Sequence, residues 1–201
     1  MKKKTLEMVQ LAILSAIIIV MSFTPLGYLK TPALSITFIS IPVCIGAMTM
    51  GPWAGVILGA VFGLTSFAQC FGLEAFGTML CGINPFTTFI VCLVPRMLIG
   101  LFAGLVYKAF QKINGKWKNA GYFVAPLVGT ITNTVFFITM LWAFFGNNAT
   151  VTGAINATTS LISFFTILAG VNALVEIPLC TIVTAPIAKA VETAVKRGTK
   201  K

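Results

Sequence analysis

The chain has 201 residues, of which 58% are hydrophobic and only 9% are charged, and its mean hydropathy is +0.99. This balance excludes an ordinary soluble domain and indicates an integral membrane protein. The formal net charge of +10 indicates attraction to anionic lipid headgroups, because no stretch interleaves basic and aromatic residues as a nucleic-acid surface would. We therefore expect one membrane domain over residues 1–201, with no soluble catalytic module and no nucleic-acid partner.

The basic residues form three clusters that indicate the orientation of the chain. Twelve of the fourteen Lys and Arg residues occur at positions 2–4, 108–118 and 189–201. Since basic loops are retained on the cytoplasmic side, all three clusters are predicted to be cytoplasmic, and both termini with them. An even number of crossings must then separate successive clusters, which predicts a multi-pass protein of the cell membrane.

Six apolar segments are predicted to be transmembrane helices, because a crossing takes about 20 residues. Four of them separate the first basic cluster from the second, and two separate the second from the third. The predicted spans are residues 6–23, 34–50, 52–71, 85–107, 120–145 and 159–188. The expected fold class is therefore an all-α membrane bundle of six helices, with outer loops at 24–33, 72–84 and 146–158.

Small residues recur at helical spacing in the first and third spans. Ala12 and Ala16 lie one turn apart in the first span, and the third span carries glycines at positions 51, 55, 59 and 63. Such faces let another backbone approach closely, which favours helix association in lipid. For the glycines we expect packing within the chain. The groove at Ala12 and Ala16 fits either a helix of this chain or a partner.

Three consecutive spans carry polar side chains at similar depth. Arg96 lies in the middle of the fourth span, Asn133 in the middle of the fifth, and Asn172 and Glu176 one turn apart in the sixth. Because an ionised side chain near the bilayer centre is unfavourable, each needs a partner or a function. Arg96 and Glu176 could neutralise each other, with the two amides completing a polar cluster. Alternatively, all four could line a cavity that holds a polar ligand. A proline beside Arg96 and another near Glu176 favour the ligand site, because proline frees a carbonyl and opens the helix locally.

The predicted outer loops supply further candidates for a ligand site. Asn84 precedes a proline at the start of the fourth span, and Tyr28 and Lys30 in the first outer loop could cap an outward-facing pocket. The five cysteines form no CxxC pair and the chain has no histidine, so we expect neither a metal site nor a cofactor. A phosphate-binding loop is also absent from the sequence, so the chain is not predicted to hydrolyse ATP or to be an enzyme.

These features resemble the S components of energy-coupling factor (ECF) transporters over essentially the whole chain. The resemblance rests on the six spans, the basic termini, the alanine pair, and the segments ITFISIPV at 36–43 and GPWAG at 51–55. S components are the substrate-capture subunits of prokaryotic vitamin importers, and two ATPases with a transmembrane coupling protein supply the energy. The resemblance implies that Ala12 and Ala16 contact the coupling protein. It also implies an outward-facing substrate pocket built from outer loops and the last three spans.

Within this family the chain is most similar to the pantothenate-type members. The similarity lies in FGLTSF at 62–67, Asn84 with the proline that follows it, and Val-Pro-Arg at 94–96. An arginine suits a small carboxylate ligand that also bears hydroxyls and an amide.

Our leading hypothesis is therefore a vitamin-binding subunit in which Arg96 pairs with the substrate carboxylate and Asn133 and Asn172 bond its polar middle. Glu176 would orient Arg96 or accept a ligand hydroxyl. The alternatives are riboflavin or another small vitamin as the substrate, a self-sufficient secondary carrier in which Glu176 is the proton-coupled group, and a structural subunit without a ligand.

Overall fold

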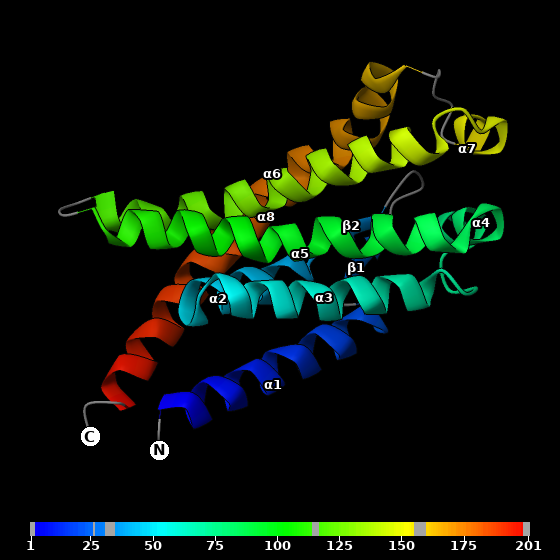
Figure 1. Ribbon diagram of the computed structural model, residues 1–201. Helices are drawn as coiled ribbons and strands as arrows, with labels where there is room; N and C mark the ends of the chain where they lie inside the picture. The colour runs from blue at the N-terminus through cyan, green and yellow to red at the C-terminus, as the bar shows by residue number, and fades with distance from the viewer. Residues whose placement is uncertain (1–2, 26, 31–34, 114–116, 155–159, 199–201) are drawn as a thin grey trace.

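A computed structural model describes residues 3–25, 27–30, 35–113, 117–154 and 160–198, which form a bundle of long helices (Figure 1). The elements in chain order are α1 (Lys3–Ser22), β1 (Tyr28–Lys30), β2 (Ser35–Thr37), α2 (Ser40–Met50), α3 (Pro52–Gln69), α4 (Ala75–Ile83), α5 (Pro85–Gln111), α6 (Trp117–Phe145), α7 (Ala149–Ala154) and α8 (Leu161–Gly198). The architecture is therefore all-helical apart from one small hairpin, formed by β1 and β2.

Among the described residues, five helices contain a stretch long and apolar enough to cross a membrane. These stretches are Thr5–Ser22, Pro52–Gln69, Pro85–Gln111, Asn119–Phe145 and Val175–Val195. They correspond to the first, third, fourth, fifth and sixth predicted spans, which confirms a multi-pass membrane protein. The helices α5 and α8 continue beyond the predicted spans, to Gln111 and Gly198.

The prediction of a helix over the whole of residues 34–50 is wrong. Ser35–Thr37 form β2, which pairs with β1 in antiparallel register, Tyr28 opposite Thr37 and Lys30 opposite Ser35. The helix α2 begins at Ser40 and has only 11 residues, eight of which are buried, so neighbouring helices rather than lipid surround it. Mean hydropathy over a window does not reveal that polar Ser35 and Thr37 alternate with apolar neighbours, and the pairing strand β1 lies in the predicted outer loop. The predicted outer loops at 72–84 and 146–158 contain the short helices α4 and α7.

Glycines bring the backbones of α3 and α5 into contact. A Cβ atom at Gly59 would lie 2.3 Å from the backbone oxygen of Arg96, and one at Gly100 would lie 2.0 Å from the backbone oxygen of Gly55. Any side chain at these positions would separate the two helices, so only glycine permits this approach. Gly55, Gly59 and Gly63 therefore pack within the chain, as expected. Gly51 does not, because it precedes α3 with a φ of +104° and a Cβ there would meet nothing within 4 Å. The resulting interface fixes the position of Arg96 relative to α3.

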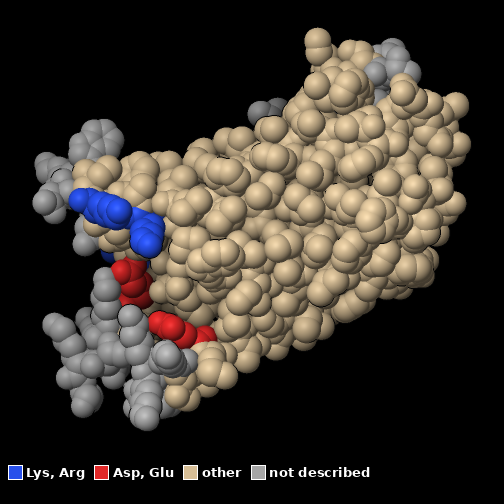
Figure 2. Space-filling model, in the orientation of Figure 1, with Lys and Arg blue, Asp and Glu red and all other residues tan. Residues whose placement is uncertain are grey.

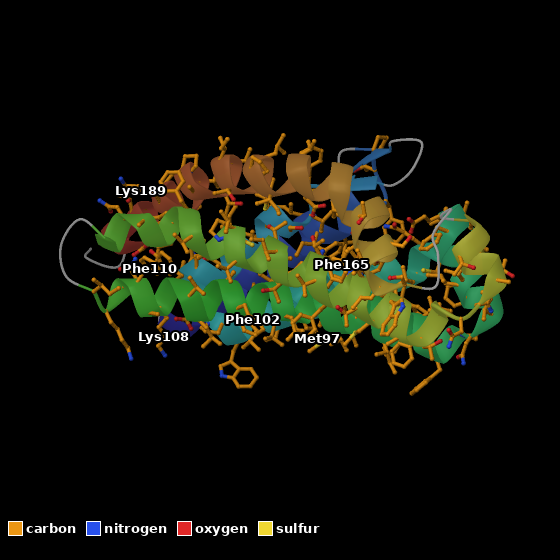
Figure 3. The ribbon with its side chains drawn as sticks, turned by 90° about the horizontal axis from the view of Figure 1, so that it is seen from above. Met97, Phe102, Lys108, Phe110, Phe165 and Lys189 are labelled. Atoms are coloured by element: carbon orange, nitrogen blue, oxygen red, sulfur yellow. The ribbon has the colours of Figure 1, made fainter. Side chains whose placement is uncertain are left out.

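Charged side chains gather at one end of the bundle. On the face drawn in Figure 2, the blue and red side chains lie at one end and the remainder is uncharged. Lys108 of α5 and Lys189 of α8 lie at this end (Figure 3), and both are exposed. The first residues of α1 and the last of α8 lie at the same end (Figure 1). The predicted topology requires such a grouping, whereas the side of the membrane on which this end lies stays a prediction.

One carboxylate joins three helices near the same end. Glu192 of α8 accepts hydrogen bonds from the hydroxyl of Tyr107 on α5 and, at 2.6 Å, from the hydroxyl of Tyr122 on α6. Carboxylate acceptors strengthen such bonds. This contact holds the extension of α8 against the two preceding helices.

Candidate functional site

The Arg96 side chain contacts three of the helices. Its Nη1 donates a hydrogen bond to the carbonyl oxygen of Val91 in α5 at 3.0 Å, and its Nη2 donates to Ser66 Oγ of α3 at 3.4 Å. The guanidinium carbon lies 5.6 Å from the ring centroid of Phe62 on α3 and 4.9 Å from that of Phe137 on α6. At these distances the aromatic rings stabilise the cation. Arg96 is thus a half-buried charge held between α3 and α6.

The proline that precedes Arg96 explains one of these bonds. Pro95 has no N–H group, so the carbonyl of Val91, four residues earlier, lacks its usual helical donor. Arg96 supplies a donor to that carbonyl from the same helix. A free carbonyl is unfavourable at membrane depth, so the proline and the arginine form a unit in which the arginine is oriented by the helix that carries it.

Asn133 shares a face of α6 with the ring that contacts the guanidinium. It lies one helical turn before Phe137, and residues four apart project to the same side of a helix. Its Oδ1 atom is buried and has no hydrogen-bond partner among the described residues, and the same holds for Nε of Arg96. A buried polar atom without a partner is unfavourable. The site therefore presents one unused acceptor and one unused donor on adjacent helices.

Glu176 is held by the hairpin and by α2. It is buried, with 8% of its surface exposed, and its Oε1 accepts a hydrogen bond from Ser40 Oγ at 3.4 Å. The backbone N–H of Thr37 also donates to this carboxylate. Glu176 and Arg96 thus have different hydrogen-bond partners, and no ion pair joins these two described side chains. Mutual neutralisation by direct contact, one of the two alternatives for this pair, is not what the structure shows.

Asn84 has a structural role at the start of α5. Its Oδ1 accepts hydrogen bonds from the backbone N–H groups of Phe86 at 3.1 Å and Thr87 at 3.3 Å. This is the N-cap arrangement, which satisfies amides that have no partner in the first turn of a helix. Asn84 is exposed, and the cap accounts for its position.

Three other predicted site residues lie where the backbone is described and the side chain is not. Tyr28 and Lys30 belong to β1, and Asn172 lies in α8 one turn before Glu176. Their side chains lie outside the described part of the structure. Their part in the site stays a prediction.

Ala12 and Ala16 are both exposed on α1. Their face of α1 is therefore accessible at the surface of the bundle. Contact with a partner protein at these positions stays a prediction.

Sequence reasoning missed the residues that hold Arg96 and Glu176. Phe62 and Ser66 lie in the segment on which the resemblance to pantothenate-type proteins rests, but no contact was assigned to them. A signal existed in the spacing. Phe62 lies three residues after Gly59, and Ser66 lies three residues after Gly63, so both belong to the face of α3 that carries the glycines. For Phe137 and Ser40 the sequence offers no comparable signal.

The arrangement suits the binding of a small polar ligand. A guanidinium and an amide oxygen with unused hydrogen-bonding capacity can bind a small polar molecule that carries an anionic group. Among the described residues, no group of three His, Cys, Asp or Glu side chains could hold a metal ion.

Three comparisons with known proteins bear on this arrangement. A protein-family model described as the substrate-specific component of ECF transporters matches residues 6–188. The pantothenic acid transporter PanT of Lactococcus lactis subsp. cremoris is 31% identical over 178 residues, which are 80% of this chain and 87% of that protein. The pantothenate transporter PanT of Leuconostoc mesenteroides subsp. mesenteroides is 30% identical over 138 residues, 66% of each chain. The solved structure of ThiT from Listeria monocytogenes has a TM-score of 0.64 and 20% sequence identity, over 94% of this chain and 96% of that one. This last likeness shows a shared fold.

Proposed function

This chain belongs to the family of substrate-specific components of ECF transporters, and on that premise we propose that it captures pantothenate at Arg96 and the residues around it. Members of this family are transport subunits that pair with the energizing module of the transporter, and they are not enzymes. The specific substrate is the part that we propose. Two relatives at about 30% identity carry the name of a pantothenate transporter, which supports it.

The observation that carries the proposal is the pair of buried polar atoms without partners, Nε of Arg96 and Oδ1 of Asn133. Pantothenate has a carboxylate at one end and an amide and hydroxyls in the remainder. The guanidinium pairs with the carboxylate, and the amide oxygen of Asn133 accepts from a hydroxyl or N–H of the ligand. Both groups then gain hydrogen bonds that no described residue supplies, which is a favourable exchange in a buried site.

The sixth span contributes the remaining groups. Asn172 and Glu176 follow each other by one turn on α8, and we assign them to the polar middle of the ligand. Glu176 is already oriented by Ser40 and by the backbone of Thr37. Thr37 is the last residue of β2, so ligand contact at Glu176 reaches the hairpin that follows the first span. Tyr28 and Lys30 in that hairpin are proposed to cap the pocket.

The proposal includes an orientation and partners. The end of the bundle with Lys108 and Lys189 faces the cytoplasm, as retention of basic segments requires. The transmembrane coupling protein contacts α1 at Ala12 and Ala16, and two ATPase subunits supply the energy. Exposure of both alanines supports this contact.

A ligand panel tests the proposed substrate. Thermal unfolding of the detergent-purified protein is measured with each B vitamin in turn, because a ligand that binds only the folded state stabilises it by about 4 kcal/mol at a thousandfold excess over Kd. We expect a shift with pantothenate and none with the others. A shift with riboflavin or another vitamin would keep the family and refute the substrate, and no shift with any vitamin would contradict the proposed capture.

A further inference from the structure

Two helices are joined by buried polar contacts at the end of α1. The hydroxyl of Ser22, the last residue of α1, hydrogen-bonds that of Thr65 on α3 at 2.9 Å. The side-chain Nε2 of Gln69, one turn further along α3, donates to the backbone oxygen of Ser22 at 2.6 Å. All three residues are buried. We call Ser22, Thr65 and Gln69 the α1–α3 clamp.

The clamp fixes a helix that is otherwise held by apolar contacts. The last carbonyls of a helix have no partner within it, and at membrane depth an unsatisfied carbonyl is unfavourable. Gln69 satisfies one of them from a different helix. Much of α1 is exposed, and the one fully buried hydrophobic residue among its described side chains is Ile18. Apolar packing alone permits sliding and rotation, whereas two directed hydrogen bonds fix the register of α1 on α3.

The same turn of α3 also contacts the proposed ligand arginine. Ser66, adjacent to Thr65, accepts the hydrogen bond from Nη2 of Arg96. Successive residues of a helix project in different directions, so Thr65 contacts α1 while Ser66 contacts α5. Figure 1 shows α3 between α1 and α5, and the contacts of α3 with both helices agree with this view.

The glycine interface makes α3 and α5 one unit near Arg96. A Cβ at Gly59 would lie 2.3 Å from the backbone oxygen of Arg96, and one at Gly63 would lie 2.8 Å from Cα of Leu93. Backbones in direct contact leave no side chains that could absorb a displacement. A shift of α5 at Arg96 would therefore displace α3, and the clamp joins α3 to α1.

We propose that the α1–α3 clamp couples occupancy of the ligand site to docking of α1 on the energizing module. Its residues position α1 and do not contact the substrate. The inference rests on the proposed function, because it takes Arg96 as the ligand residue and α1 as the docking helix. Coupling of this kind is reciprocal, so ligand binding and docking change each other's affinity by the same factor.

The test measures that factor directly. The affinity of the purified energizing module for this protein is measured with and without saturating pantothenate, and the ratio of the two Kd values is compared between wild type and Gln69→Leu. We expect a wild-type ratio that differs from 1 by about 5-fold or more and a ratio close to 1 in Gln69→Leu. Pantothenate affinity of the variant without the module should stay within about threefold of wild type, because a threefold change corresponds to under 1 kcal/mol.

Two further variants separate coupling from general damage. Thr65→Val keeps the side-chain shape and the Gln69 bond but removes the bond to the Ser22 hydroxyl, so its ratio should lie between those of wild type and Gln69→Leu. Thr49→Val is the matched control, since the Thr49 hydroxyl bonds only to Ile45 O of its own helix, at 2.8 Å, among the described contacts. Its ratio should equal that of wild type. If Gln69→Leu does not fold, Thr65→Val carries the test alone.

Three results would overturn the inference. These are a wild-type ratio of 1, an unchanged ratio in both clamp variants, and an equal change in Thr49→Val. Failure of the proposed substrate is distinguishable, because the wild-type protein alone would then not bind pantothenate. The ratio is in that case measured with the vitamin that does stabilise the protein.

Discussion

Arg96 owes its orientation to its neighbour in the sequence. Pro95 has no N–H group to bond the carbonyl of Val91, and the guanidinium of Arg96 donates to that carbonyl instead. Ser66 accepts a second hydrogen bond from the guanidinium, and two aromatic rings lie against it. A side chain fixed in this way loses little conformational freedom when a carboxylate binds, which favours affinity.

We predict that Arg96→Ala weakens pantothenate binding by about 30-fold or more. Removal of one partner of a buried, hydrogen-bonded charge pair costs about 2–5 kcal/mol, and each 1.4 kcal/mol is about tenfold in Kd. Arg96→Lys keeps the charge but loses the planar fork, so its affinity should be intermediate. Isothermal titration of the purified proteins measures these differences.

The matched control for this prediction is Lys108→Ala, which removes a positive charge from an exposed position at the end of α5. It should bind pantothenate as wild type does. Wild-type affinity in Arg96→Ala would show that the site has been assigned to the wrong residue.

The variant Asn133→Leu should lower ligand affinity without lowering stability. In Asn133→Leu the ligand loses one acceptor, which should lower affinity by about tenfold. Stability without ligand should not fall, because the Oδ1 atom that is removed is buried without a partner among the described residues. Titration and thermal unfolding of the same preparation measure both effects. A lower melting temperature with unchanged affinity would instead identify a structural amide.

Sequence reasoning predicted the depth of these residues but not their partners. Depth is predicted by counting along an apolar segment, so the common level of Arg96, Asn133 and Glu176 stays a prediction. Partners depend on how each helix is rotated about its axis. Ser40 and Phe137 gave no signal for that reason, because serine and phenylalanine occur throughout such helices.

At the scale of elements, the interface between α3 and α5 is built by glycine. Gly55 and Gly100 meet backbone to backbone, and the polar residues Thr65, Ser66 and Gln69 lie further along the same helix α3. Shape complementarity takes the place of a hydrophobic driving force, which lipid does not supply between helices.

Gly100→Ala should therefore destabilise the protein by about 1–3 kcal/mol, the usual effect of overpacking. The added Cβ would lie 2.0 Å from the backbone oxygen of Gly55, so α3 and α5 would have to separate. Gly82→Ala in α4 is the control, since a Cβ there meets nothing within 4 Å and alanine favours the helix by up to about 1 kcal/mol. Thermal unfolding without ligand measures both, and equal stability of the two variants would contradict this account of the interface.

Hydropathy predicted the long helices and failed at the hairpin. An 18-residue apolar helix such as α3 exceeds the length of any ordinary strand, so its type follows from length alone. Residues 34–39 are not uniformly apolar, because Leu34, Ile36 and Phe38 alternate with Ser35 and Thr37, a period of two that is typical of a strand. Mean hydropathy over a longer window hides this alternation, and Ser35–Thr37 pair with Tyr28–Lys30.

At the scale of the whole molecule, the charge distribution and the polar site divide the bundle along its length. Exposed basic residues such as Lys108 and Lys189 lie at one end (Figure 3), and the hairpin, α4 and α7 lie away from it (Figure 1). Arg96, Asn133 and Glu176 lie between, within the long helices. In the proposed orientation, a ligand that enters from outside reaches the proposed capture site before the basic end of the bundle.

Uptake of labelled pantothenate into proteoliposomes tests the central claim most directly. The purified chain is reconstituted with and without the energizing module of its own organism, in the presence or absence of ATP. The account predicts uptake that requires the chain, the module and ATP together, and that Arg96→Ala abolishes. Uptake by the chain alone under a proton gradient would contradict it and identify a secondary carrier, and so would transport of a different vitamin by the complete assembly.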